Sequence, residues 1–301
     1  MPRERLSAGE KGARFFFLLC AALSLGAMLL IVVFIFREAA GLFIDGPEGP
    51  GISPKEFFLS PLWYPGYEPA EYGTLSLAAA SLAVTALSVL LAGPLGLGLA
   101  VYLACVAGKR VREWVKPVVE LLAAIPSVVL GFVGMVVVAP FMQSVLDIPS
   151  GLNLTNAALL LALMATPTIA SIGDDALSSV PREVKDASTA LGATQWETIW
   201  RVTMPAAVSG LSTAVILGLG RALGETMVVL MVAGGSAQIP GSLFDSIRPL
   251  TSTLAAEMAE TPIGSRHYQA LFAIGGVLFM MTLAFNLTAF WLGRRWKGKT
   301  A

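Results

Sequence analysis

Hydrophobic residues along this chain gather in long, continuous runs that are separated by shorter polar segments. Because the runs do not alternate between apolar and polar positions, they indicate helices and not the strands of a membrane barrel. A helix that crosses a bilayer needs about 20 mostly apolar residues. Six runs satisfy this requirement, and we predict transmembrane helices at residues 15–36, 74–107, 117–139, 156–173, 206–233 and 268–292.

Three of the predicted helices contain an internal proline, at Pro94, Pro126 and Pro167. Proline removes a backbone donor and clashes with the preceding turn, so we expect each of these helices to be broken there. The first run follows several charged residues and could belong to a signal peptide. Its 22 residues exceed the roughly 7–15 residues of the apolar part of such a peptide. We therefore interpret residues 15–36 as a membrane anchor.

The composition supports an all-α integral membrane protein. Of the 301 residues, 55% are hydrophobic and 13% are charged, and the mean hydropathy is +0.74. A soluble domain carries about 25% charged residues, so this chain has too few polar side chains to cover a soluble globule. A formal net charge of zero gives no indication of nucleic-acid binding. Two cysteines and one histidine do not support a disulfide framework or a cysteine-rich metal site. The histidine, His267, is predicted to be a solvated loop residue.

The distribution of positive charge predicts the orientation in the membrane. Of the 20 Lys and Arg residues, 15 lie in the N-terminal tail, in the segments after the second and fourth predicted helices, and in the C-terminal tail. Positive residues accumulate on the cytoplasmic side of membrane proteins. We therefore expect both tails, 1–14 and 293–301, to be cytoplasmic. Residues 37–73 are then a periplasmic loop, and residues 74–292 form the core with the other five helices.

The segment at about 181–204, between the fourth and fifth predicted helices, has the pattern of two short helices. Pro181 suits a first helical turn, and Gly192 suits a C-terminal cap. Thr194 and Glu197 have the spacing of a capping box, which predicts the start of the second helix.

Both short helices are predicted to be amphipathic, and Pro205 is expected to end the second one. The apolar faces consist of Val184, Ala187 and Leu191 on the first helix and Trp196, Ile199 and Trp200 on the second. Such helices either lie on a bilayer or insert into a groove on a partner protein. The pattern by itself leaves both possibilities open.

The same segment resembles the coupling loop of binding-protein-dependent ABC importers. In that family Glu-Ala-Ala is followed by three residues, a glycine, nine residues and Ile-x-Leu-Pro. Here Asp186-Ala187-Ser188 is followed by three residues, Gly192, nine residues and Val202-Thr203-Met204-Pro205, so the spacing matches and four identities differ conservatively. In the family this loop docks on the cytoplasmic ATPase. The resemblance implies that the residues coupled to the ATPase are Asp186, Ala187, Ser188, Gly192, Trp196, Trp200 and Pro205.

Other segments resemble the PstC-type permease subunits of phosphate importers, among them AIPSVVLGFVG, GLGRALGETMVVLMVAGG and LTSTLAAEMAE. The resemblance implies a type I importer permease fold and transport of inorganic phosphate across the bacterial inner membrane. It also implies three kinds of protein partner besides membrane lipid: a second, PstA-like permease subunit, two cytoplasmic ATPase subunits and a periplasmic phosphate-binding protein. ATP is then used by a partner subunit, and the chain itself is expected to be no enzyme and to bind no cofactor or metal.

Two charges, Arg221 and Glu225, lie near the centre of the fifth predicted helix. A charge at that depth costs roughly 2.5–3.5 kcal/mol on insertion scales. Residues four apart share a helix face, so we expect these two to form an ion pair. The pair is either purely structural or lines the substrate pathway, where a guanidinium matches the oxygens of an oxyanion and the Thr226 hydroxyl is close by. The resemblance to phosphate importers favours the pathway.

The C-terminal sequence GRRWKGKT, residues 293–300, matches the pattern of a P-loop. A P-loop follows a strand and opens a helix, whereas this sequence follows a predicted membrane helix, so we interpret it as a basic tail. Two alternatives to a phosphate permease are kept. The same architecture could carry sulfate or molybdate, or the chain could be an ion-driven carrier or a membrane enzyme. A carrier is expected to have inverted repeats and an enzyme a nucleophile–base or metal set, and neither is evident in the sequence.

Overall fold

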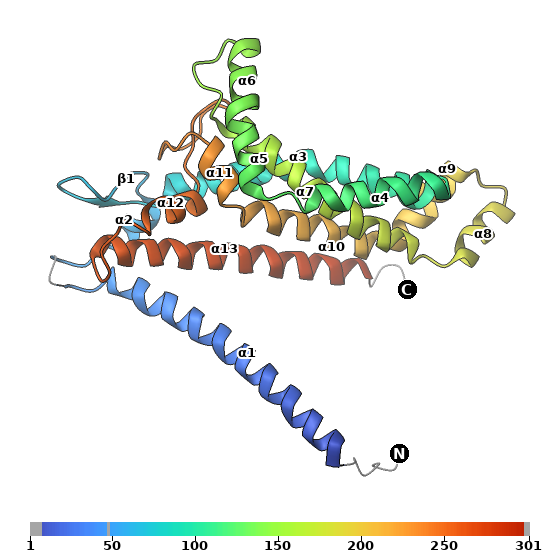
Figure 1. The fold of residues 1–301 in the computed structure, drawn as a ribbon, viewed down its shortest axis with the longest axis horizontal. Coiled ribbons are helices and arrows are strands. Elements are labelled where there is room, and N and C mark those ends of the chain that lie inside the picture. The colour runs from blue at the N-terminus through green and yellow to red at the C-terminus, as the bar shows by residue number, and fades with distance from the viewer. Residues whose placement is uncertain (1–7, 47–48, 298–301) are drawn as a thin grey trace.

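The computed structural model describes residues 8–46 and 49–297 of the chain. Within them, six helical segments are long and apolar enough to cross a membrane: Gly12–Gly41, Leu75–Val106, Ser127–Leu146, Leu154–Ser178, Gln195–Leu223 and Arg266–Thr288. Figure 1 shows the long helices that run side by side as a bundle, namely α3 (Leu75–Val101), α7 (Leu154–Ser178), α10 (Met204–Leu223) and α13 (Arg266–Lys297). The prediction of an all-α membrane protein with six spans is confirmed.

The bundle is packed closely around α7. Ile169 of α7 is fully buried and faces two glycines on neighbouring helices, Gly96 of α3 and Gly218 of α10. A Cβ atom added to Gly96 would lie 2.7 Å from Ile169 Cβ, and one added to Gly218 would lie 2.5 Å from Ile169 Cγ1. Small residues let membrane helices approach closely, so these glycines set the distance of α3 and α10 from α7.

The N-terminal helix α1 (Ala8–Gly41) meets the bundle near its C-terminal end and diverges from it toward its N-terminus (Figure 1). Near the contact, Phe34 packs edge-on against Phe272 of α13, with ring centroids 5.4 Å apart. Nearly all side chains from residue 15 to residue 33 are exposed in the single chain. The helix begins before residue 15, so part of the predicted N-terminal tail is helical, and residues 1–7 lie outside the described residues.

The bounds that we predicted for the third transmembrane helix, residues 117–139, are wrong. The structure divides this region into α4 (Lys109–Ala123), α5 (Ser127–Val133), a π-helical segment η2 (Gly134–Val138) and α6 (Ala139–Leu146). The break falls at Pro126, whose extended ψ of 133° precedes α5, because a proline cannot continue the hydrogen bonds of the helix before it. α4 lies along the bundle, whereas α6 projects away from it (Figure 1).

The other two prolines do not break their helices. Pro94 lies inside α3 and Pro167 lies inside α7, and both helices continue through them. The lost backbone hydrogen bond is tolerated in a membrane helix that is supported by its neighbours, and α3 and α7 pack along one another. The helical geometry of the second span instead changes at its C-terminal end, where α3 passes into a π-helical segment η1 (Tyr102–Val106).

The fifth predicted helix, residues 206–233, is interrupted. α10 ends at Leu223, and the short helix α11 (Met227–Val232) begins after three further residues. At its other end α10 is entered from α9 (Gln195–Thr198) through a π-helical segment η3 (Ile199–Thr203). Pro205 therefore does not end the preceding helix: the helical segment runs from Gln195 to Leu223, and Pro205 lies where η3 passes into α10.

The outer segments contain more regular structure than the predicted loops. Residues 37–73 include α2 (Pro54–Leu59) and a two-stranded antiparallel hairpin of β1 (Trp63–Tyr64) and β2 (Glu71–Tyr72). A further helix, α12 (Leu250–Glu257), lies between α11 and α13. At the other end of the chain, α13 continues to Lys297, so the P-loop-like sequence starts inside a helix, and residues 298–301 lie outside the described residues.

Glu257, the last residue of α12, joins the outer elements. Its carboxylate accepts hydrogen bonds from Trp63 Nε1 at 3.1 and 3.2 Å, and its oxygens lie 2.6 Å from Arg248 Nη2 and 2.7 Å from His267 Nε2. The prediction that His267 is a solvated loop residue is wrong, because it lies in the first turn of α13 and faces this carboxylate. Glu257 thereby ties the β-hairpin and α13 to α12.

Candidate functional site

The interruption between α10 and α11 separates the two charges that we expected to pair. Arg221 lies in the last turn of α10, and Gly224 ends that helix. Glu225 follows in the connecting segment, so the two side chains do not share a continuous helical face. Among the ion pairs of the described residues, none joins Arg221 to Glu225. The prediction of an ion pair between Arg221 and Glu225 is therefore wrong.

Arg221 instead bonds to the backbone of another helix. Its Nη2 atom donates a hydrogen bond to the carbonyl oxygen of Ala123 at 3.1 Å. Ala123 is the last residue of α4, and the last carbonyls of a helix have no partner within the helix and carry partial negative charge. The guanidinium thus holds the end of α4 at the Ala124–Pro126 break, and its side chain is exposed in the single chain.

Glu225 is also satisfied by backbone groups. Its Oε1 atom accepts hydrogen bonds from the amides of Thr226 and Met227 at 3.1 Å each and from the amide of Val228 at 3.4 Å. These amides begin α11, and a carboxylate is stabilised by the free amides and positive end of a helix. The carbonyl oxygen of Glu225 accepts a further bond from Thr251 Oγ1 at 2.9 Å, which attaches this segment to α12.

The structure brings the three predicted pathway residues to one interruption in a membrane span. Thr226 stands at the N-cap of α11, and its hydroxyl lies 3.4 Å from the carbonyl oxygen of Gly224. Because Glu225 bonds to α11, the positive charge of Arg221 is not neutralised by it. A guanidinium that is bound to a single carbonyl keeps donors that can bind an oxyanion.

The first predicted helix of the loop at 181–204 is confirmed as α8 (Arg182–Ala190), and the second starts after Thr194 as predicted, but it continues from α9 through η3 into α10. Gly192 has a φ of +86°, and the amides of Gly192 and Ala193 bond back to the carbonyls of Thr189 and Ser188. This is the Schellman arrangement that ends a helix. The capping box of Thr194 and Glu197 is present as predicted.

The apolar side chains of this loop form an exposed surface, which we call the docking surface: Val184, Ala187, Leu191, Trp196 and Trp200. Leu191 is 90% exposed, and Trp196 and Trp200 stack edge-on at 5.5 Å. A groove of about 480 Å³ is lined by Val184, Ala187 and Leu191 of this surface together with Glu197 and Arg201. Ile199 differs from the prediction, because it is buried.

Side-chain hydrogen bonds fix the two docking helices in place. Ser188 of α8 and Thr198 of α9 join through their hydroxyls at 2.9 Å, and Gln195 Nε2 donates to the carbonyl oxygen of Cys105 at 2.8 Å. Asp186 is exposed, and Pro205 is exposed at the start of α10. All seven residues predicted to couple to an ATPase lie in this loop or at the start of α10, and Ala187, Ser188 and Gly192 among them line the groove.

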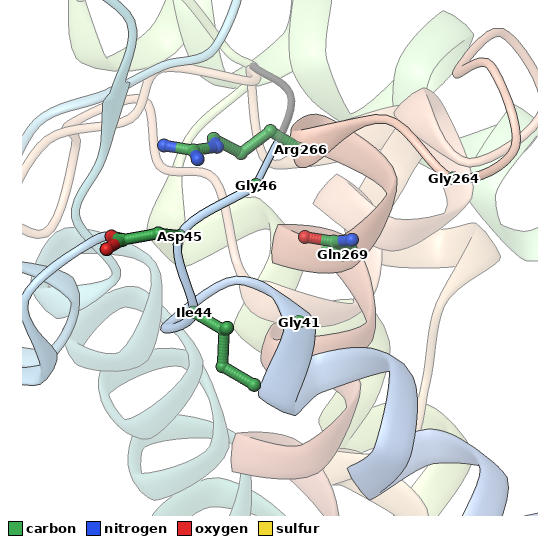
Figure 2. A pocket seen from close by; sticks show the side chains of 7 residues that line it. All are labelled: Gly41, Ile44, Asp45, Gly46, Gly264, Arg266 and Gln269. Carbon is green, nitrogen blue, oxygen red and sulfur yellow. The ribbon is translucent and has the colours of Figure 1, made fainter. Parts of the chain in front are cut away.

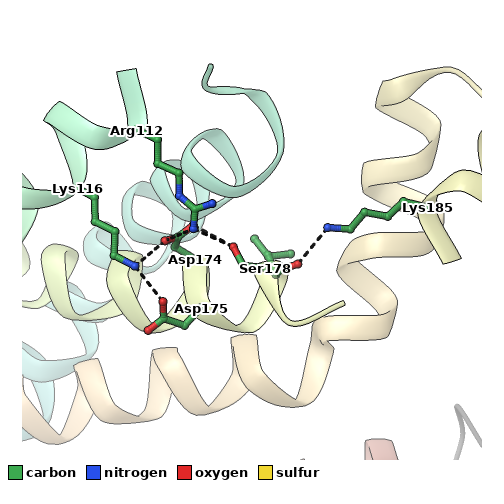
Figure 3. A network of polar contacts seen from close by, with 7 residues as sticks. Arg112, Lys116, Asp174, Asp175, Ser178 and Lys185 are labelled. Atoms are coloured by element: carbon green, nitrogen blue, oxygen red, sulfur yellow. Dashed lines mark hydrogen bonds and ion pairs between the residues drawn. The ribbon is translucent and has the colours of Figure 1, made fainter. Parts of the chain in front are cut away.

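A cluster of charges that the sequence analysis did not single out lies between α4 and α7 (Figure 3). Asp174 of α7 is fully buried, and its two carboxylate oxygens lie 2.9 Å from Arg112 Nη2 and from Lys116 Nζ. Lys116 also reaches Asp175 at 2.9 Å. These hydrogen bonds to Asp174 and Asp175 raise the pKa of Lys116 above its ordinary value. The acidic pair at the end of an apolar run was the available signal in the sequence.

A small pocket of about 210 Å³ lies between the end of α1 and the start of α13 (Figure 2). Its arginine, Arg266, donates to the carbonyl oxygens of Gly49 and Pro50. The Arg266 guanidinium therefore closes the loop that contains Gly49 and Pro50. The residues that line this pocket do not include Arg221 or its partner Ala123. Across residues 8–46 and 49–297, no group of three or more His, Cys, Asp or Glu side chains is placed to hold a metal ion.

A multi-helix membrane protein with an interrupted, charged span and a protruding amphipathic loop has the construction of a membrane-spanning transport subunit. The chain belongs to the family of binding-protein-dependent transport system inner membrane components, whose sequence pattern matches residues 94–298. The structure shows the geometry of the loop at 181–204, whose spacing resembles that of the family.

Individual relatives agree with this assignment. The chain is 37% identical over 295 residues to the probable ABC transporter permease protein YqgH of Bacillus subtilis (strain 168), covering 98% of this chain and 94% of that protein. It is 33% identical over 275 residues to the phosphate transport system permease protein PstC of Mesorhizobium japonicum (strain LMG 29417 / CECT 9101 / MAFF 303099), covering 85% and 83%.

Solved structures share the fold. A bacterial alginate ABC transporter in complex with a pentasaccharide-bound periplasmic protein matches with a TM-score of 0.63 at 18% identity, over 95% of this chain and 96% of that chain. The methionine ABC transporter MetNI in an inward-facing conformation matches with a TM-score of 0.58 at 21% identity, over 72% and 93%. The predicted type I ABC importer permease fold is thereby confirmed.

Proposed function

We propose that the chain is one of the two permease subunits of an ATP-driven importer for inorganic phosphate. The observation that carries the proposal is the exposed guanidinium of Arg221, which lies at the interruption of a membrane span and is not neutralised by Glu225. Relatives named as phosphate transport permeases support phosphate as the substrate. A dianion must be desolvated to enter a membrane pathway, and a guanidinium offsets that cost through charge and paired donors.

The proposed assembly contains a second, PstA-like permease subunit, two cytoplasmic ATPase subunits and a periplasmic phosphate-binding protein. ATP is hydrolysed on the ATPase subunits, and this chain binds no cofactor or metal. The docking surface supports an ATPase partner, because exposed tryptophans and a groove with apolar lining residues on the same loop are typical of an interface. The chain lies in the bacterial inner membrane. The positive charges at both ends support a cytoplasmic location of both termini.

Labelled-phosphate uptake by proteoliposomes tests the proposal. The vesicles hold this chain, the second permease and the ATPase, with the binding protein added, and the amount of assembled complex is measured separately. We expect Arg221→Gln to lower uptake per complex at least about tenfold, because a charge-assisted hydrogen bond contributes roughly 1.5–3 kcal/mol. Arg221→Lys keeps the charge but loses the planar fork, so its uptake should be intermediate.

The control is Arg14→Gln, which makes the same change on the exposed part of α1. Its uptake should match that of the unaltered chain. Near-normal uptake by assembled Arg221→Gln complexes would contradict the role of Arg221. Preferred uptake of labelled sulfate or molybdate over phosphate would contradict the substrate.

A further inference from the structure

α4 connects the candidate pathway to the loop that carries the docking surface. Its last residue, Ala123, accepts the hydrogen bond of Arg221. Its N-terminal half carries Arg112 and Lys116, which face α7 and bind Asp174 (Figure 3). One continuous helix of 15 residues therefore contacts the pathway arginine at one end and the end of α7 at the other.

Polar contacts hold α4 in place to an unusual degree. Val119 is its only buried residue, whereas Trp114 is 79% exposed and Leu121 is 69% exposed. A helix that buries little apolar surface gains little from packing. In the single chain, the ion pairs of Arg112 and Lys116 therefore contribute to the position of α4 along α7.

Asp174 is the residue on which these ion pairs depend. It has no exposed surface, and two cations occupy its oxygens at 2.9 Å each, with Ser178 Oγ as a weaker partner at 3.4 Å. The side chain of the neighbouring Asp175 is 69% exposed, and among the described residues it forms an ion pair with Lys116 alone. A buried carboxylate without its cations is strongly unfavourable, while an exposed ion pair contributes little.

The end of α7 is attached in turn to the docking helices. Lys185 of α8 donates from Nζ to the carbonyl oxygen of Leu177 at 3.3 Å, and Val180 packs with Leu177 in one buried cluster. Only residues 179–181 separate α7 from α8. The Asp174 region therefore has a short, packed route along α7 to α8 and the docking surface.

We propose that α4 couples Arg221 to the docking surface and that Asp174 is the positioning residue that holds α4 in the coupled state. This inference rests on the proposed function, in which Arg221 binds the transported anion. When the anion binds the remaining donors of Arg221, Nη2 also exchanges the Ala123 carbonyl for a phosphate oxygen, because a charged acceptor forms the stronger hydrogen bond. This exchange releases the end of α4 at the break before Pro126. The released helix acts on Asp174 through Arg112 and Lys116, and α7 passes the change to α8. Coupling of this kind is reciprocal, so ATPase-driven movement of α8 also resets Arg221.

The test compares Asp174→Asn with Asp175→Asn, a matched control at the next residue of the same helix. Proteoliposomes with the complete importer are assayed for labelled phosphate moved per ATP hydrolysed, a ratio that a loss of assembled complex does not change. We expect the ratio to fall at least about fivefold for Asp174→Asn, the lower end of typical coupling between sites. Asp175→Asn should stay within about twofold, as for an exposed ion pair. Asp174→Glu keeps the charge and should restore part of the ratio.

Two milder variants cover the case in which Asp174→Asn does not assemble. Arg112→Gln and Lys116→Gln each remove one cation from partly exposed positions and leave the other on Asp174. Each should lower the ratio, whereas Arg110→Gln, an exposed change on the same helix, should not. Unaltered ratios in all assembled Asp174, Arg112 and Lys116 variants would overturn the inference, as would equal losses for Asp174→Asn and Asp175→Asn. If Arg221→Gln transports normally, the proposed function fails instead.

Discussion

Arg221 donates a hydrogen bond to the carbonyl oxygen of Ala123, 3.1 Å away and 98 positions earlier in the chain, and not to Glu225, four positions later. Each of the two charges in the fifth span is thus stabilised by a helix end. The guanidinium meets the free carbonyls of α4, and the carboxylate meets the free amides of α11. Helix ends are sites of partial charge, so both charges are accommodated without pairing, and Arg221 keeps donors for an anion.

Changes at Glu225 distinguish a helix cap from an ion pair. Glu225→Gln keeps an oxygen that can accept from the amides of Met227 and Val228, whereas Glu225→Ala removes it. We expect Glu225→Ala to lose about 1 kcal/mol of stability, the usual cost of a lost cap, and Glu225→Gln to lose less. Thermal unfolding of the purified chain in detergent measures the difference. Equal losses for the two variants would contradict the capping role.

Gly192 tests the geometry of the docking surface. A Cβ atom there would touch nothing within 4 Å, so only the φ of +86° opposes a side chain. We expect Gly192→Val to cost about 1–2 kcal/mol through the left-handed backbone and to misplace α9 relative to α8. Co-purification of the ATPase should fall, while membrane insertion is kept. Gly192→Asn serves as control, because asparagine tolerates this conformation, and it should retain more ATPase than Gly192→Val.

The stacked tryptophans are expected to carry much of the ATPase affinity. Trp196→Ala and Trp200→Ala should each weaken binding at least about tenfold, because buried interface tryptophans commonly cost 2 kcal/mol or more on truncation. Titration of purified ATPase against the chain in nanodiscs gives the affinity. Trp114→Ala removes a similarly exposed tryptophan from α4 and should leave it unchanged. Unchanged binding by the Trp196 and Trp200 variants would place the interface elsewhere.

Close packing at Ile169 predicts different costs for two glycines of α3. Gly96→Ala places a Cβ atom 2.7 Å from Ile169 Cβ, whereas Gly98→Ala meets nothing within 4 Å. Overpacking of a close contact costs about 1–3 kcal/mol, so Gly96→Ala should lower the unfolding temperature and Gly98→Ala should not. Similar unfolding temperatures for both variants would show that α3 and α7 can separate without cost.

The contacts of Glu257 with Trp63, Arg248 and His267 predict that the stability of the fold depends on pH in the acid range. Burial would raise the pKa of the Glu257 carboxyl, but the hydrogen bond from His267, the charge of Arg248 and the hydrogen bond from Trp63 hold it below its usual value of 4.5. A lowered pKa in the folded state stabilises the fold above pH 4.5, and this stabilisation is lost as the pH falls through the lowered value.

The unfolding temperature of the purified chain should therefore decline more steeply below pH 4.5 than that of Glu257→Gln, which lacks the titrating group. The variant should also be less stable at neutral pH, because Arg248 and His267 lose their charged partner. Parallel pH profiles for the two proteins would assign the acid sensitivity to other groups.

Features that are determined by residues close together in the chain, or by the surrounding lipid, could be predicted from the sequence. The apolar runs predict the spans, because lipid selects long hydrophobic helices wherever they occur in the chain. The docking helices follow from the glycine at 192 and the capping box of Thr194 and Glu197, since caps are made by residues within one turn. The residue spacing of this loop resembles that of binding-protein-dependent importers, and the family match over residues 94–298 supports the same family.

The tertiary structure alone decided where the charges go. Pairing of Arg221 with Glu225 is the local expectation for two charges four apart, but the end of α10 at Gly224 and the approach of Ala123 replace it. Asp174 lies 62 positions from Arg112 and 58 positions from Lys116 in the chain, beyond the reach of any helical spacing rule. Trp63 and Glu257 meet across 194 positions. A buried charge must find a partner, and which partner is available depends on how the helices pack, which the local pattern does not contain.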